Sequence, residues 1–170
     1  SSLVTGVQTC ALPISAMAGA GRPQALDTAL ATMAQSQHPL LEQLEPHRSC
    51  IHACTDVTGF GLLGHLGEML ASSPPLQITL RTETIPAYPN ALTLLSQGHR
   101  SSLAPANRRS WKWLDGPVQL DHSPSEALLE LMVDPQTCGP LLLACPPSTA
   151  ENLTAQGPWT QIGTAATARG

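Results

Sequence analysis

Apolar residues recur along this chain with two spacings, one typical of helices and one typical of strands. After Pro23, which suits a first helical turn, Leu26, Ala29, Leu30 and Met33 fall on one helical face. Other segments alternate apolar and polar residues, which is the period of a half-buried strand. We expect helices at residues 23–38, 40–44, 62–70, 89–98, 123–134 and 147–156, and strands at 49–57, 76–85, 139–146 and 159–165.

The order of these segments predicts the fold class. Strands and helices alternate along the chain, which indicates an α/β or layered α+β fold. The 16 prolines and 13 glycines imply many turns between the elements. Residues 99–124 show neither period and are expected to be irregular, and Ser123 or Ser125 is expected to cap the helix that follows.

Composition argues against several classes of function. The net charge of −4 disfavours a nucleic-acid partner, and no run of 18 apolar residues predicts a membrane span. The chain start does not resemble a signal peptide and the five cysteines do not have disulfide-scaffold spacing, so we expect a cytoplasmic protein with reduced thiols. Residues 1–15 match nothing around them and are expected to be a non-native or disordered leader, with the domain at 16–170.

Asp56 is the candidate for chemistry, within the stretch "HACTDVTGFGLLGHLGEML" from His52 to Leu70. It lies where an expected strand gives way to a glycine turn and a helix, a position that suits ligand binding. Backbone N–H groups of a turn containing Gly59 suit an anion, and a carboxylate beside bound phosphate most naturally holds Mg²⁺, with Thr58 as a further hydroxyl. The alternative is that Asp56 only caps the helix.

The glycine repeat after Asp56 favours a structural interpretation. Gly61, Gly64 and Gly67 recur every third residue, which is more typical of close helix packing than of ligand contact. "DPQTCGP", from Asp134 to Pro140, reads as a turn whose polar side chains are candidates for a ligand.

The cysteines near Asp56 invite a zinc interpretation, which their spacing disfavours. His47, Cys50, His52 and Cys54 are the candidate ligands, but Cys50, His52 and Cys54 would share one face of a strand, too flat a row to close a tetrahedral site. Small buried cysteines are the better interpretation.

Two of these stretches carry a resemblance to a known family. "HACTDVTGFGLLGHLGEML" and "DPQTCGPLLLACPP" resemble the signature stretches of the selenophosphate synthetase (selenide, water dikinase) family, and "IPAYPNALTLLSQG", from Ile85 to Gly98, is similar to the segment between them. The resemblance runs from about Ala16 to the C-terminus. It implies the C-terminal domain of the aminoimidazole ribonucleotide synthetase-like fold, with a mixed sheet covered by helices.

The resemblance also implies a reaction and a site. The family makes selenophosphate, AMP and phosphate from selenide, ATP and water, with Mg²⁺ on the polyphosphate, and we expect a homodimer of the whole protein. Asp56 matches the aspartate that this lobe contributes to Mg²⁺, with Thr58 and Gly59 as weaker candidates for the ATP pocket. No residue matches the family's catalytic Cys and Lys, so the chain is expected to be inactive without an N-terminal lobe.

The chain differs from the usual sequence of the family at two positions. Cys138 and Pro140 stand where the family commonly has a serine and a glycine, and Pro140 removes a backbone N–H. Two alternatives stay open: a lobe of another synthetase of the superfamily, of the purine-pathway type, and a non-catalytic binding or dimerisation module.

Overall fold

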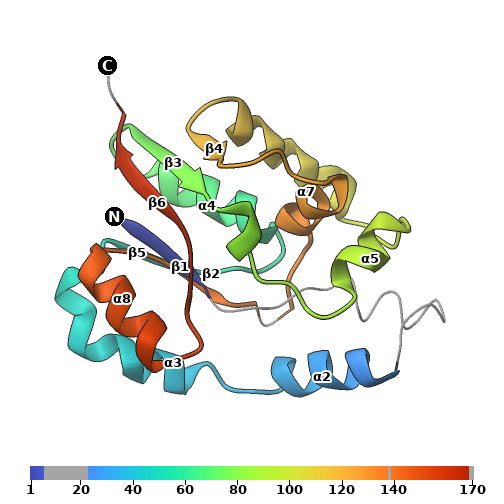
Figure 1. Cartoon of the computed structure of the whole chain (residues 1–170), viewed down its shortest axis with the longest axis horizontal. Helices are drawn as coiled ribbons and strands as arrows, with labels where there is room; N and C mark the ends of the chain where they lie inside the picture. Colours follow the sequence, from blue (N-terminus) through green and yellow to red (C-terminus); the bar gives the residue numbers. More distant parts are fainter. Residues whose placement is uncertain (6–22, 138, 169–170) are drawn as a thin grey trace.

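A mixed six-stranded sheet forms the centre of the computed structural model, which describes residues 1–5, 23–137 and 139–168. Its strand order is β2-β5-β1-β6-β3-β4, and every neighbouring pair is antiparallel except β3 and β4 (Figure 1). The strands are β1 (Ser2–Thr5), β2 (Ala53–Asp56), β3 (Leu76–Leu80), β4 (Val118–Leu120), β5 (Leu141–Cys145) and β6 (Thr160–Thr167). The mixed sheet confirms the expected fold class.

Helices pack on both faces of this sheet. The α-helices are α2 (Pro23–Met33), α3 (His38–Leu44), α4 (Gly61–Ala71), α5 (Ala91–Ser96), α6 (Ala104–Asn107), α7 (Glu126–Val133) and α8 (Pro147–Gln156). The 3₁₀ helices are η1 (Glu45–Cys50), η2 (Thr82–Thr84) and η3 (Arg108–Asp115). In Figure 1, α3 and α8 lie on one side of the sheet and α4 and α7 on the other.

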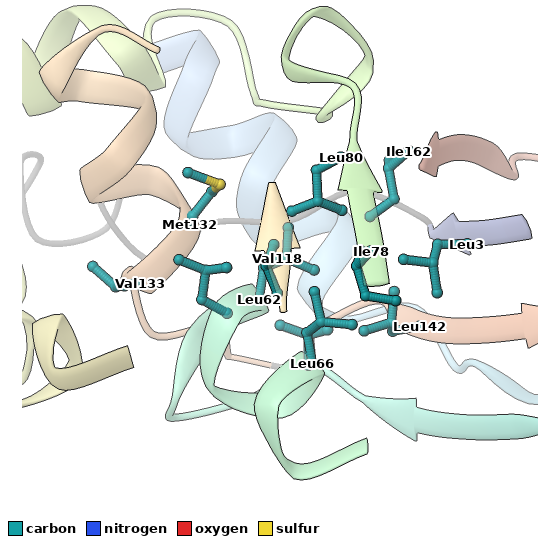
Figure 2. Packing of buried hydrophobic residues seen from close by; sticks show 12 residues of the cluster. Leu3, Leu62, Leu66, Ile78, Leu80, Val118, Met132, Val133, Leu142 and Ile162 are labelled. Carbon is teal, nitrogen blue, oxygen red and sulfur yellow. The ribbon is translucent and has the colours of Figure 1, made fainter. Parts of the chain in front are cut away.

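Each face of the sheet has its own apolar core. Figure 2 shows the larger one, where Leu62 and Leu66 of α4 and Met132 of α7 meet the strands. The second core packs α8 and Trp159 against the other face. Burying these aliphatic side chains supplies the main favourable term of folding.

The N-terminal residues differ from the expectation of a leader outside the fold. Ser2–Thr5 form β1, which pairs with both β5 and β6 and is buried along its whole length. Leu3 packs in the core on one face and Val4 in the core on the other, because successive side chains of a strand point to opposite faces. Four residues are too few for a period to be recognised, which is why the sequence pattern missed this strand. Residues 6–15 lie outside the described residues.

The other expected helices and strands appear in the expected order, with differences in extent. The expected strand at 49–57 begins only at Ala53, after η1, and the expected strand at 76–85 ends at Leu80, before η2. The segment expected to be irregular, residues 99–124, contains α6, η3 and β4. In α2, Ala29 is buried as expected but Leu30 is exposed. The hydroxyl of Ser125 accepts a hydrogen bond from the N–H of Leu128 and caps α7, as one of the two expected serines. None of the described helices is long and apolar enough to cross a membrane.

Candidate functional site

Asp56 is the last residue of β2, the edge strand next to β5. Its side chain is exposed, and no hydrogen bond or ion pair to its carboxylate is found among the described residues. It does not cap α4, because that helix has Phe60 at its N-cap and no side-chain cap. The capping alternative for Asp56 is therefore wrong, and its carboxylate is available to a ligand.

The turn after Asp56 is joined to the second motif stretch by backbone hydrogen bonds. The N–H of Val57 donates to the carbonyl of Pro140 over 2.8 Å, and the N–H of Gln136 donates to the carbonyl of Thr58 over 3.0 Å. Pro140 therefore acts here through its carbonyl, which proline retains. Cys138 lies outside the described residues.

Two glycines permit this close approach. Gly61 has φ +69°, and a Cβ on it would lie 2.7 Å from the backbone of Val133 at the end of α7. A Cβ on Gly139 would collide with the carbonyl of Val57. Side chains at these positions would push the two motif stretches apart.

Gly59 differs from these glycines because the space beside it is open. A Cβ on Gly59 would meet nothing within 4 Å, and its φ is not positive. Within the described part of the chain, no backbone carbonyl accepts the N–H of Gly59 or Phe60. Two N–H groups close in sequence to Asp56 are therefore free to donate to a ligand, and their role in binding an anion stays a prediction.

The Thr58 hydroxyl lies 3.2 Å from Nε2 of His65, so it is engaged within the protein. Nδ1 of His65 lies 3.0 Å from the exposed Glu68 carboxylate, and the ring is buried at 7% exposure. His65 is thus a packed histidine that orients Thr58. Because its hydroxyl already contacts His65, Thr58 is a weaker candidate for a direct ligand, and its place in the ATP pocket stays a prediction.

The glycine repeat on α4 serves packing. A Cβ on Gly64 would clash with Phe60, and one on Gly67 would clash with the indole of Trp113. Gly67 lets Trp113 of η3 lie directly against the helix, and Gly64 leaves room for the side chain of Phe60, as the interpretation of close packing predicted.

The cysteine row near Asp56 forms no metal cluster. Within the described ranges, no three His, Cys, Asp or Glu side chains gather closely enough to hold an ion. Cys50 and Cys54 are exposed, so the expectation that they are buried is wrong, whereas Cys145 is buried as expected. Partial desolvation, and secondarily the charge of Asp56, raise the pKa of the Cys54 thiol.

One residue of this region was missed from the sequence. Asn107, at the end of α6, donates from Nδ2 to the carbonyl of Gly59 over 2.7 Å and to that of Val133 over 3.0 Å. It comes from the segment expected to be irregular, and no local pattern distinguishes it from any other asparagine.

Comparisons with known proteins give the family. The family model described as "AIR synthase related protein, C-terminal domain" matches residues 8–169. A protein named selenide, water dikinase from Desulfitobacterium hafniense (strain DSM 10664 / DCB-2) is 37% identical over 131 residues, 75% of this chain and 35% of that protein. A protein of the same name from Rhizobium meliloti (strain 1021) is 41% identical over 100 residues, which are 59% of this chain and 28% of that protein. The chain thus spans about a third of the length of such relatives.

Solved structures agree on the fold. The hydrogenase maturation protein HypE in complex with ATP aligns with a TM-score of 0.58 at 18% identity, covering 98% of this chain and 42% of that one. Thiamine monophosphate kinase from Aquifex aeolicus aligns with a TM-score of 0.56 at 13% identity, covering 99% and 48%. With the matched family model and the selenide, water dikinase relatives, this chain belongs to the AIR synthase related proteins, as their C-terminal domain.

Proposed function

We propose that this chain supplies Asp56 as a Mg²⁺ ligand to an ATP-dependent selenide, water dikinase. That enzyme makes selenophosphate, AMP and phosphate from selenide, ATP and water. The observation that carries the proposal is the exposed carboxylate of Asp56, without a hydrogen bond or ion pair among the described residues, followed in the same turn by the free N–H groups of Gly59 and Phe60. The names of the curated relatives support the choice of reaction.

The residues present fit a shared magnesium site. Mg²⁺ takes about six oxygen ligands and is commonly held by one or two carboxylates together with substrate phosphates and water. Asp56 offers one carboxylate, and the described residues hold no cluster that would complete the shell. Bound Mg²⁺ neutralises polyphosphate charge, while the N–H groups of Gly59 and Phe60 would orient phosphate oxygens. The other ligands then come from the nucleotide, water and the rest of the enzyme.

Paramagnetic line broadening tests the role of Asp56 on this chain itself. Mn²⁺ substitutes for Mg²⁺ and broadens nearby amide signals even at low occupancy, so weak binding is detectable. We expect Mn²⁺ with ATP to broaden the signals of residues 55–60, and Asp56→Asn to remove this effect. The melting temperature should stay unchanged, since the carboxylate makes no hydrogen bond or ion pair among the described residues.

Asp115→Asn is the matched control, because Asp115 is another exposed aspartate, in η3. It should leave the broadening intact. Equal broadening in wild type and Asp56→Asn would contradict the assignment of Asp56 as a Mg²⁺ ligand.

Selenide dependence separates this function from the alternatives. In the complete enzyme, ATP turnover stimulated by selenide and lost in Asp56→Asn supports the proposal. Turnover stimulated by a purine precursor supports another synthetase, and absence of Mg·ATP binding supports a non-catalytic module. A cytoplasmic homodimer is part of the same proposal, and its subunit number is measurable by light scattering.

A further inference from the structure

A single buried amide bridges the two motif stretches. Asn107 is 7% exposed, and its Nδ2 donates to the carbonyls of both Gly59 and Val133. Gly59 belongs to the turn after Asp56, whereas Val133 ends α7 and precedes the stretch from Asp134 to Pro140. One side chain from a third element therefore fixes the spacing between the two.

The carbonyl of Val133 needs such a partner. The last four carbonyls of a helix have no partner within the helix, and Val133 is the C-terminal residue of α7. A buried carbonyl without a hydrogen-bond donor destabilises the folded state, so the amide of Asn107 stabilises the end of α7 by donating to it. Its second hydrogen then holds the Gly59 carbonyl at a fixed distance from α7.

We propose that Asn107 is a positioning residue, which holds the turn from Val57 to Gly61 so that the Asp56 carboxylate and the Gly59 N–H face one ligand together. This inference rests on the proposed function of Asp56. Backbone hydrogen bonds at Val57 and Thr58 hold the first half of the turn. The Gly59 carbonyl is held by Asn107, so the second half of the turn depends on that amide.

The first test is structural and needs no ligand. Amide hydrogen exchange is measured for Val57, Gly61 and Gln136, whose N–H groups donate to carbonyls within the two stretches. In Asn107→Ala we expect exchange at Gly61 to accelerate by about tenfold or more, the equivalent of one lost hydrogen bond. Amides of β5 should change no more than the global stability requires.

The second test asks whether the position matters for the ligand. The Mn²⁺ concentration that half-broadens residues 55–60 in the presence of ATP should rise by about fivefold or more in Asn107→Ala. Saturating Mn²⁺ should restore full broadening, because Asp56 itself is still present. A purely structural role would lower the melting temperature and leave this concentration unchanged.

Trp159→Phe is the matched control. It removes another buried donor, the indole N–H that donates to Oε1 of Gln43 over 2.8 Å, in the core on the other face of the sheet. It should lower stability without changing the Mn²⁺ dependence. If Asn107→Ala does not fold, Asn107→Ser, which keeps one donor, is measured with the same criteria.

The outcomes separate the two proposals. If wild type shows no Mn·ATP broadening at residues 55–60, the proposed function of Asp56 fails, and the positioning role falls with it. If wild type broadens but Asn107→Ala has an unchanged Mn²⁺ dependence, the positioning role alone is overturned. Unchanged exchange at Gly61 would likewise overturn it.

Discussion

At the scale of single residues, the free groups of the candidate site stand next to groups that are fully engaged. Gly61 and Gly139 are fixed by backbone contacts, and Thr58 by His65. By contrast, the Asp56 carboxylate and the Gly59 N–H have no hydrogen-bond partner among the described residues, while the Gly59 carbonyl accepts from Asn107. The engaged groups hold the geometry, and the two free groups are where a ligand has room to bind.

This contrast makes Gly59→Ala informative. The added methyl group meets nothing in the protein, so the melting temperature should stay within about 2 °C of wild type, as for a surface substitution. If phosphate approaches the Gly59 N–H, the methyl group should weaken Mn·ATP binding several-fold. Titration by line broadening measures this, and unaltered binding in a folded variant would exclude Gly59 from the pocket.

The sequence predicted Asp56 but not Asn107, and the reason is physical. Asp56 stands at a strand end before a glycine turn, which is a local pattern. The role of Asn107 arises from contacts with residues 48 and 26 positions away, which no local period encodes. Thr58 was predicted as a ligand because its hydroxyl lies two positions after Asp56 in sequence, whereas the partner of that hydroxyl in the structure is His65.

At the scale of elements, the segment from 99 to 115 is anchored on α7 by charge. Glu130 of α7 is buried, at 2% exposure, between Arg100 and Arg108. Its Oε1 accepts from Arg108 over 2.8 Å, and its Oε2 lies 3.4 Å from Nε of Arg100. Arg100 and Arg108 therefore flank α6, which carries Asn107, and tie this segment to α7.

Glu130→Gln should destabilise the protein. The neutral amide removes the negative charge that Glu130 supplies to both arginines, and Arg108 then has no other ion pair among the described residues. Because those arginines are 31% exposed, we expect the free energy of unfolding to fall by about 1–3 kcal/mol, less than for a fully buried ion pair. Urea denaturation measures the difference.

Glu126→Gln provides the comparison. Glu126 also pairs with Arg100, at 3.1 Å, but its side chain is 79% exposed. The substitution Glu126→Gln should lower the free energy of unfolding by under about 1 kcal/mol, since exposed ion pairs contribute little. Equal losses in the two variants would contradict the buried role of Glu130.

At the scale of the whole molecule, β1 holds the sheet together. β2 and β5 form one part, and β6, β3 and β4 form another, with β1 between them. The longer helices and strands were predictable because each repeats its spacing of apolar residues over several helical turns or several strand positions. β1 was not, since its place depends on partners more than 130 residues away along the chain.

Leu3→Ala tests this role. Leu3 is 1% exposed in the larger core, so we expect a loss of about 2–5 kcal/mol in the free energy of unfolding. Leu103→Ala, at a leucine 52% exposed, should cost little. Equal stability of the two variants in urea denaturation would show that the N-terminal residues do not form a strand in solution.

The central position of β1 also constrains the order in which the chain folds during synthesis. β1 pairs with residues 142–145 and 160–164, which are made more than 130 positions later along the chain. The sheet is therefore completed only after β5 and β6 have been made, and until then both edges of β1 lack their partner strands. Such open strand edges favour pairing with other chains. Expression at reduced temperature, or a synthetic peptide of residues 1–5 added to a shortened chain, would act on this late step.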